Sequence, residues 1–380
     1  MEAVTIRQVN DMAERVDRDR RHFAWRTAMA IGAAHLGMFG RLAEALAKAG
    51  PEAGAAESEG ASRELTAIGR ASEWLNSPRL TPEALAGKVV LVQFCTYTCI
   101  NWLRTLPYVR AWERKYRQQL VVIGVHTPEF AFEHNVDNVR RALQQMNVTY
   151  PVVMDNDYAI WRAFDNNSWP ALYFVDARGR VRQHHFGEGE YEQSEKAIQR
   201  LLAEAGSTGV RDGESVKVEA AGVEAPADWA NLRSPENYVG YQRTEGFASP
   251  RGIDRDRRRL YAAPARLALN QWALAGDWTI GPQATILNSP TGRITYRFRA
   301  RDVHLVMGPS RRERQVRFRV SIDGQPPGPA HGSDVDAGGN GMAVEQRLYQ
   351  LLRQSRPIDD RQFEIEFLDT GVETFAFTFG

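Results

Sequence analysis

An apolar segment runs directly into a helical pattern, and the two cysteines of the chain, Cys95 and Cys99, lie at the junction. Residues 88–94 are mostly apolar, which predicts a buried strand. Residues 100–116 carry apolar side chains at helical spacing, which predicts a helix. Cys99 therefore lies at the predicted helix N-terminus, where backbone N–H groups and the helix dipole favour the thiolate form of a thiol. We predict a reactive thiolate at Cys99, and a buried structural cysteine is the alternative.

Strands alternate with helices from this apolar segment to about residue 205. This order predicts an α/β domain with a central sheet and flanking helices. The last two predicted strands form a hairpin, which makes the sheet mixed. The predicted strands span residues 88–94, 120–126, 150–154, 171–176 and 181–185, and the predicted helices span residues 100–116, 136–146, 158–164 and 192–205.

The length and charge of the chain limit the classes of protein it can represent. A chain of 380 residues exceeds one ordinary hydrophobic core, so we expect two domains with extensions. The 48 basic and 47 acidic residues give a net charge of +1, which argues against a nucleic-acid partner. Two cysteines can form one bridge or remain two thiols. No spacing of histidines or carboxylates resembles a metal site, so we predict neither a metal nor a cofactor.

Changes in composition divide the chain into four segments. Residues 1–62 combine a signal-like segment with a linker of small and acidic residues. Residues 63–206 hold the alternating pattern, and residues 207–233 form a second linker. Residues 234–380 contain strand signals separated by glycine, aspartate and proline turns. We therefore predict an α/β domain followed by an all-β domain.

The N-terminal region resembles a targeting sequence. Arg20 and Arg21 precede Phe23 and a weakly apolar run at residues 27–39. The run is too short to span a bilayer as a helix, and the pattern resembles a twin-arginine export signal. We therefore predict a periplasmic or otherwise extracytoplasmic protein without a membrane span. If the segment is instead an amphipathic helix, the protein is cytoplasmic.

Four features of residues 63–206 point to a known family. Cys99 follows the first core strand, and Pro107 lies eight residues later, inside the predicted helix. Trp169-Pro170 precedes a strand, and Ala-Arg-Gly-Arg at residues 177–180 joins two closing strands. These features resemble the thioredoxin-like redoxins of the TlpA and ResA kind. They are most similar to the thioredoxin-like part of DipZ-type proteins.

This resemblance implies a thiol-disulfide oxidoreductase in which Cys99 attacks the disulfide of a protein substrate. It also implies that Trp169 and Pro170 position the substrate chain, with Thr96 and Trp102 beside them. Proteins of this family carry a second cysteine three residues after the first, where this chain has Trp102. The mixed disulfide must then be resolved by another thiol, either an external thiol reductant or the second cysteine of this chain.

Cys95 can bridge to Cys99 only if the chain bends between them. A disulfide needs two Cα atoms within about 7 Å, whereas four residues of extended chain span up to roughly 13 Å. The three residues between the cysteines include neither glycine nor proline, so the sequence does not demand a bend. Cys95 is therefore either a resolving thiol or a core thiol.

A second chemistry also fits this junction. Thr96 stands three residues before Cys99, the spacing at which peroxiredoxins orient peroxide, and Arg104 could stabilise a developing anion. A one-cysteine peroxidase would form a sulfenic acid and depend on an external thiol. His126 could tune the thiolate, and Glu129 could supply an acid or a base. Structural roles are the alternative for each of these polar residues.

Short strands dominate residues 234–380, which predicts an antiparallel sandwich, most simply a jelly roll. The resemblance to DipZ-type proteins implies a module similar to carbohydrate-binding jelly rolls. Trp272 and Trp278 are candidate sugar-binding residues because sugars stack on exposed aromatic faces, and burial in the core is the alternative. If the α/β domain has no turnover, the chain is a binding module whose sandwich recognises a carbohydrate or a protein.

Overall fold

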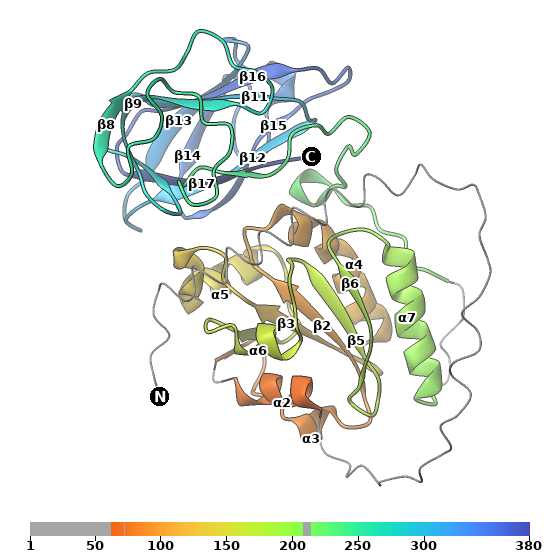
Figure 1. Ribbon diagram of the computed structural model, residues 1–380. Coiled ribbons are helices and arrows are strands. Elements are labelled where there is room, and N and C mark those ends of the chain that lie inside the picture. The colour runs from red at the N-terminus through yellow and green to blue at the C-terminus, as the bar shows by residue number, and fades with distance from the viewer. Residues whose placement is uncertain (1–61, 72, 208–213) are drawn as a thin grey trace, which may run out of the picture.

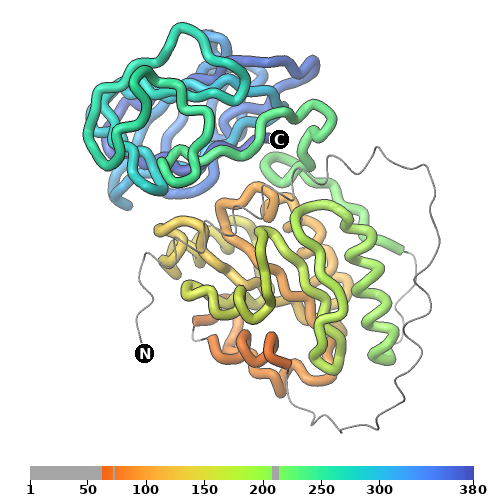
Figure 2. Tube along the Cα trace, viewed as in Figure 1, coloured from red at the N-terminus to blue at the C-terminus, as the bar shows by residue number. Residues whose placement is uncertain are grey.

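The computed structural model describes residues 62–71, 73–207 and 214–380, which form two lobes (Figures 1 and 2). The predicted export signal lies outside the described residues. None of the helices in the described part of the chain is both long enough and apolar enough to cross a membrane.

The described residues of the first lobe form a six-stranded mixed sheet in the order β1-β4-β3-β2-β5-β6. All seven residues of the central strand β2 are buried, as expected for a strand covered on both faces. β2 runs parallel to β3 and antiparallel to β5. The strands are β1 (Trp74–Leu75), β2 (Val89–Cys95), β3 (Leu120–His126), β4 (Val152–Met154), β5 (Ala171–Val175) and β6 (Val181–Phe186).

Helices cover this sheet. In α4 the apolar side chains face the core, and Pro107 lies inside the helix. α4 packs beside α7, where the Tyr116 hydroxyl donates to Glu195 (2.7 Å). The helices are α2 (Arg63–Arg70), α3 (Pro82–Leu85), α4 (Ile100–Tyr116), the 3₁₀ helix η1 (Ala131–His134), α5 (Val136–Gln145), α6 (Ala159–Ala163) and α7 (Tyr191–Glu204). The prediction of a thioredoxin-like α/β fold is confirmed.

The second lobe, here called the β-lobe, is one curled sheet of antiparallel strand pairs in the order β14-β13-β16-β11-β9-β10-β17-β12-β15. The first half of β9 pairs with β11 and its second half pairs with β10, so the sheet turns at this strand. Facing strands meet across the core, as the rings of Tyr296 and Phe377 do at 5.1 Å. The antiparallel architecture is confirmed, whereas the jelly-roll connectivity stays a prediction.

The strands of the β-lobe are β7 (Asn237–Tyr238), β8 (Arg258–Tyr261), β9 (Trp272–Ile280), β10 (Thr285–Leu287), β11 (Gly292–Phe298), β12 (Asp302–Pro309), β13 (Val316–Ile322), β14 (Asn340–Ala343), β15 (Arg347–Arg353), β16 (Arg361–Phe367) and β17 (Val372–Phe379).

The two lobes meet along an apolar seam. Phe375 of β17 packs against Phe130 and Phe132, with ring centroids 5.2 and 4.8 Å apart. Tyr238 and Leu348 of the β-lobe also join the buried core of the first lobe. The lobes therefore share hydrophobic core as well as surface contacts.

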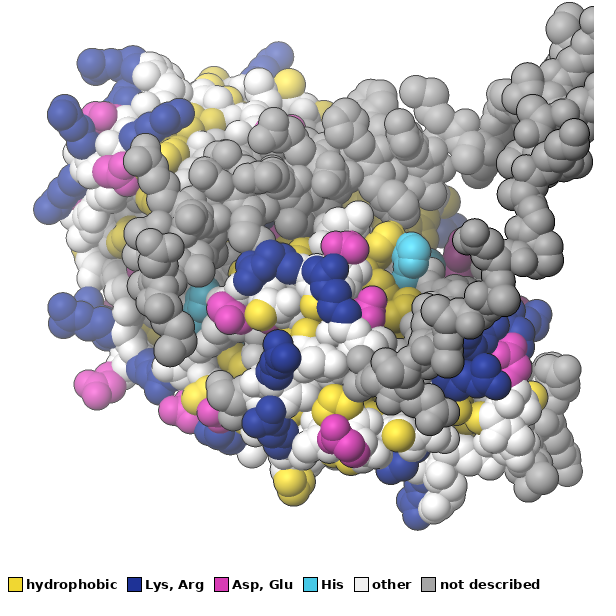
Figure 3. All heavy atoms as spheres, turned by 60° about the horizontal axis from the view of Figure 1, so that its bottom comes forward, with side chains coloured by type: hydrophobic (Ala, Val, Ile, Leu, Met, Phe, Trp, Pro, Cys, Tyr) yellow, Lys and Arg dark blue, Asp and Glu magenta, His cyan; other side chains and the backbone are white. Residues whose placement is uncertain are grey.

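Charges of both signs are mixed on the surface. On the face drawn in Figure 3, basic and acidic side chains of the described residues alternate over short distances. This distribution agrees with the net charge of +1. A continuous basic stripe, the usual footprint of nucleic-acid binding, is not visible on the described part of this face.

Candidate functional site

Cys99 caps the N-terminus of α4, as the sequence predicts. Its backbone is extended (φ −76°, ψ 114°), and its carbonyl accepts the N–H of Leu103 (3.0 Å). The side chain is only 5% exposed. Its Sγ lies 3.8 Å from the carbonyl oxygen of Trp169. The start of α4 and the loop before β5 therefore bring these two predicted site residues together.

The Trp169–Pro170 peptide bond is cis. The Trp169 indole is buried against Trp161, with ring centroids 4.4 Å apart. On the other side, the Pro170 carbonyl accepts the N–H of Gly187 (2.8 Å). These contacts fix the loop that presents the Trp169 carbonyl to Cys99.

Cys95 is a core thiol at the end of β2. It is 1% exposed, and its Sγ lies 3.4 Å from the Val125 carbonyl. Burial raises the pKa of this thiol well above its usual range, so it stays protonated at neutral pH. Cys95 and Cys99 are two thiols and not a disulfide. Trp102, at the position of the missing second cysteine, is fully buried.

Glu133 is a site residue that the sequence analysis missed. Its carboxylate is fully buried and accepts the Thr98 hydroxyl (2.7 Å) and the backbone N–H groups of Glu129 (2.7 Å) and Phe130 (2.9 Å). Burial raises its pKa to about 7, although these hydrogen bonds oppose the shift. Glu133 can therefore exchange a proton near neutral pH, and it holds the residue that precedes Cys99.

Comparisons with known proteins identify similar thioredoxin-like proteins. Residues 234–380 match the thioredoxin-like C-terminal domain family. Protein DipZ of Mycobacterium bovis is 33% identical over 316 residues, which cover 81% of this chain and 41% of DipZ. The thiol-disulfide oxidoreductase YkuV of Bacillus subtilis is 29% identical over 131 residues, which cover 34% of this chain and 88% of YkuV. This chain is a thioredoxin-like redoxin.

One solved structure, a thioredoxin-like protein in the oxidized form, is 32% identical and covers 36% of the redoxin and 90% of its own chain, with a TM-score of 0.33. The redoxin spans about two fifths of the length of DipZ, since the alignment covers 41% of that protein.

His126 lies at the end of β3, opposite Cys95 in the parallel pair. It is fully buried and stacks on Tyr97, with ring centroids 5.9 Å apart. Burial lowers its pKa to about 3, so the imidazole is neutral at neutral pH. This does not support the prediction that His126 tunes the thiolate by its charge. In the part of the redoxin that the structure describes, no group of three histidine, cysteine or carboxylate side chains could hold a metal ion.

Arg104, predicted as a residue that could stabilise an anion, is a buried ion-pair partner. It is 2% exposed and pairs with Glu188 (2.9 Å). Its Nη2 also lies 3.5 Å from the Phe379 carbonyl of β17. The guanidinium therefore ties α4 to the β6–α7 loop and to the β-lobe.

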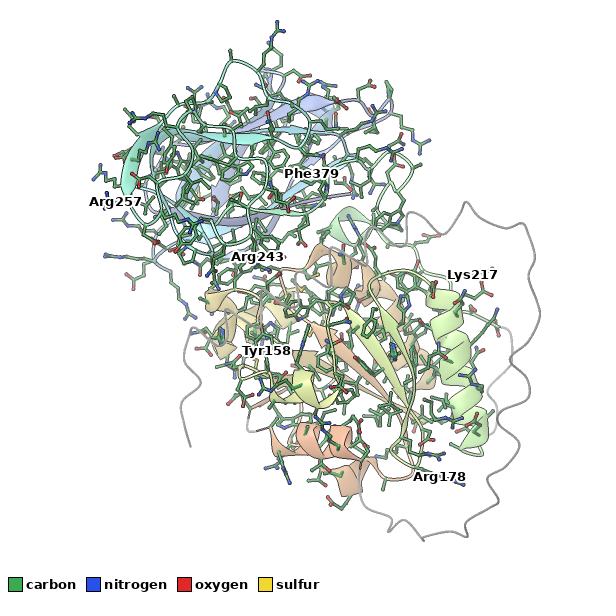
Figure 4. All side chains as sticks on the ribbon, in the orientation of Figure 1. Tyr158, Arg178, Lys217, Arg243, Arg257 and Phe379 are labelled. Atoms are coloured by element: carbon green, nitrogen blue, oxygen red, sulfur yellow. The ribbon has the colours of Figure 1, made fainter. Side chains whose placement is uncertain are left out.

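Glu129 also belongs to the seam. Its carboxylate accepts the Tyr238 hydroxyl (2.5 Å) and pairs with Arg243 (3.1 Å), both from the β-lobe. The Arg243 guanidinium lies over the Tyr238 ring, 3.5 Å from its centroid. Figure 4 shows Arg243 at the boundary between the lobes. The predicted acid or base is therefore an ion-pair partner of the β-lobe.

The loop between the two cysteines is covered by the β-lobe. Thr96 is fully buried and Tyr97 is 2% exposed. The Tyr97 hydroxyl donates to the Gln346 carbonyl of the β-lobe (3.1 Å). The thiol site of the redoxin therefore lies beside the seam and not on an open face.

The sugar-binding prediction for Trp272 and Trp278 is wrong. Both side chains are fully buried in the β-lobe core. The Trp272 indole donates to Thr244 (3.1 Å), and the Trp278 indole donates to the Ala275 carbonyl (2.9 Å). Neither ring offers the exposed face that sugar stacking requires.

Proposed function

We propose that the redoxin is an exported thiol-disulfide oxidoreductase in which Cys99 attacks the disulfide of a protein substrate. The observation that carries the proposal is the position of Cys99 at the N-terminus of α4, with its sulfur 3.8 Å from the Trp169 carbonyl. The helix N-terminus favours the thiolate. The name of the similar YkuV protein, a thiol-disulfide oxidoreductase, supports the same activity.

The reaction proceeds by thiol-disulfide exchange. The Cys99 thiolate attacks one sulfur of the substrate disulfide, so a mixed disulfide forms and the other substrate sulfur leaves as a thiolate that takes a proton. An external thiolate then attacks the Cys99 sulfur and releases the second substrate thiol. A second external thiolate attacks that external sulfur and regenerates Cys99. Two external thiols are thereby oxidised to one disulfide, and the substrate disulfide is reduced to two thiols.

The structure favours an external thiol over Cys95 for resolution. Cys95 is buried at the end of β2, and the raised pKa of its thiol leaves little thiolate at neutral pH. Trp102 fills the position from which a second cysteine would act. Glu133, whose pKa lies at about 7, is positioned through Thr98 to exchange protons during the reaction.

The proposal assigns a role to each segment. Residues 1–62 carry the protein out of the cytoplasm and link it to the redoxin domain at residues 63–206. The linker at residues 207–233 leads to the β-lobe at residues 234–380, a domain that we place in the jelly-roll class. The β-lobe covers the thiol site and contributes Tyr238 and Gln346 to its surroundings.

The test is to incubate the full chain with a peptide disulfide and to measure its intact mass. We expect one peptide adduct in the native protein and in Cys95→Ser, and none in Cys99→Ser. An adduct that persists in Cys99→Ser would contradict the proposal. Oxidation of Cys99 to a sulfenic acid by peroxide, without a peptide adduct, would favour a thiol peroxidase instead.

A further inference from the structure

A chain of polar contacts leads from the β-lobe to the residue before Cys99. We call Arg243, Tyr238, Glu129, Glu133 and Thr98 the seam relay. Arg243 and Tyr238 both bind the Glu129 carboxylate, at 3.1 and 2.5 Å. The backbone N–H of Glu129 donates to Glu133 (2.7 Å), and Glu133 accepts the Thr98 hydroxyl (2.7 Å). The relay therefore connects the two lobes at the thiol site.

The relay holds two carboxylates in a buried site. The Glu129 side chain is 5% exposed and Glu133 is fully buried. Like charges in a site of low polarity raise each other's affinity for a proton. Arg243, itself 12% exposed, supplies the positive charge that offsets this repulsion.

Several titratable groups near the two carboxylates are neutral at neutral pH. Burial raises the pKa values of Cys95, Tyr97 and Tyr158 above their usual ranges, and it lowers those of His126 and His134. Asp155, whose pKa burial raises to about 6, is ionised at neutral pH, and Cys99 is the proposed thiolate. Arg141 of α5 and Arg312 and Glu345 of the β-lobe act on the more distant Tyr97 hydroxyl. Arg243 pairs directly with the Glu129 carboxylate of the relay.

We propose that Arg243 and Tyr238 are positioning residues for the thiol site: by holding Glu129 as an ion-paired carboxylate, they set the pH at which Glu133 exchanges its proton. The link from Glu133 to the reaction rests on the proposed function, but the effect on proton exchange does not. Docking of the β-lobe thereby sets the pH at which Glu133, a residue of the first lobe, exchanges its proton.

The experiment follows the side-chain carboxyl groups of the full chain by carbon-13 NMR as a function of pH, with Glu133→Gln and Glu129→Gln used to assign the signals. In Arg243→Met we expect the first protonation of the Glu129–Glu133 pair to move to higher pH by about one unit. Arg243→Lys keeps the charge and should stay close to the native midpoint. Tyr238→Phe should shift the midpoint in the same direction as Arg243→Met.

Arg312→Met is the matched control, because Arg312 binds Asn135 (2.7 Å) and Asn138 (2.8 Å) across the same seam without contacting the relay. We expect it to leave the midpoint unchanged. An unchanged or lowered midpoint in Arg243→Met would overturn the proposal, as would an equal rise in Arg312→Met. Peptide adducts at Cys99 are measured separately, so failure of the oxidoreductase function is distinguishable from failure of the relay.

Discussion

The position of each side chain in the thiol site decides its chemistry. Cys99 and Cys95 are four positions apart, yet one caps a helix beside a carbonyl and the other lies in the core at the end of a strand. The pKa of Glu133 differs from that of a surface carboxylate, because burial raises it from 4.5 to about 7. The protonation of Glu133 therefore couples the stability of the fold to pH.

The first prediction concerns this coupling. The folded protein binds the Glu133 proton more tightly than the unfolded chain does, so the contribution is complete below about pH 4.5 and is lost as the pH rises through about 7. Relative to Glu133→Gln, the native protein should lose up to about 3 kcal/mol of unfolding free energy between pH 4 and pH 8. Urea unfolding of both proteins measures the difference. A difference that stays constant across this pH range would contradict the prediction.

The second prediction concerns Trp102. Restoring the family's dithiol spacing with Trp102→Cys leaves a large cavity, because the indole is fully buried. We expect a loss of about 3 kcal/mol or more in unfolding free energy. Trp229→Cys is the control, because that side chain is 60% exposed and its loss should cost less than about 1 kcal/mol. Equal costs for the two variants would show that Trp102 does not support the core.

At the scale of elements, the sequence predicts those strands and helices that have a periodic or continuous pattern of apolar residues. The strand at β2 and the helix at α4 follow from an apolar run and from helical spacing, and both are present. The seam could not be predicted, because its contacts join residues such as Glu129 and Tyr238 that are more than a hundred positions apart. Glu133 was missed because a single carboxylate has no periodic signature. Its aromatic neighbours Phe130 and Phe132 are the signal that could have indicated burial.

The third prediction concerns the buried hydrogen bonds that connect β2 to α4. Gln93 of β2 accepts the Tyr150 hydroxyl (2.9 Å) and donates to Thr105 of α4 (2.7 Å), and all three side chains are buried. Gln93→Leu leaves both partners without this contact and should cost about 2 kcal/mol of unfolding free energy. Chemical denaturation measures the loss. The double variant Gln93→Leu with Tyr150→Phe should recover part of it, and the absence of any recovery would count against this network.

At the scale of the whole molecule, the seam borders the thiol site. Phe375 packs on Phe130 and Phe132, and Tyr97 is held by the Gln346 carbonyl. Cys99, two residues after Tyr97, is only 5% exposed. We expect a bulky substrate to reach its sulfur only after a local opening at the seam.

The fourth prediction follows from this closure. Phe375→Ala should raise the rate at which iodoacetamide alkylates Cys99 about fivefold, as expected if local opening becomes about 1 kcal/mol easier. Phe318→Ala is the control, since Phe318 packs on Tyr349 and Phe367 inside the β-lobe. An equal increase in both variants would attribute the effect to general destabilisation and not to the seam.

The shared seam also limits how this protein can be recombined with its relatives. Glu129 and Phe130 lie in the loop after β3, yet their partners Tyr238, Arg243 and Phe375 belong to the β-lobe. A chimera that exchanges only one lobe would bury the Glu129 carboxylate without its cation unless both parents carry the same pairing. We therefore expect recombination between relatives to transfer the two lobes together.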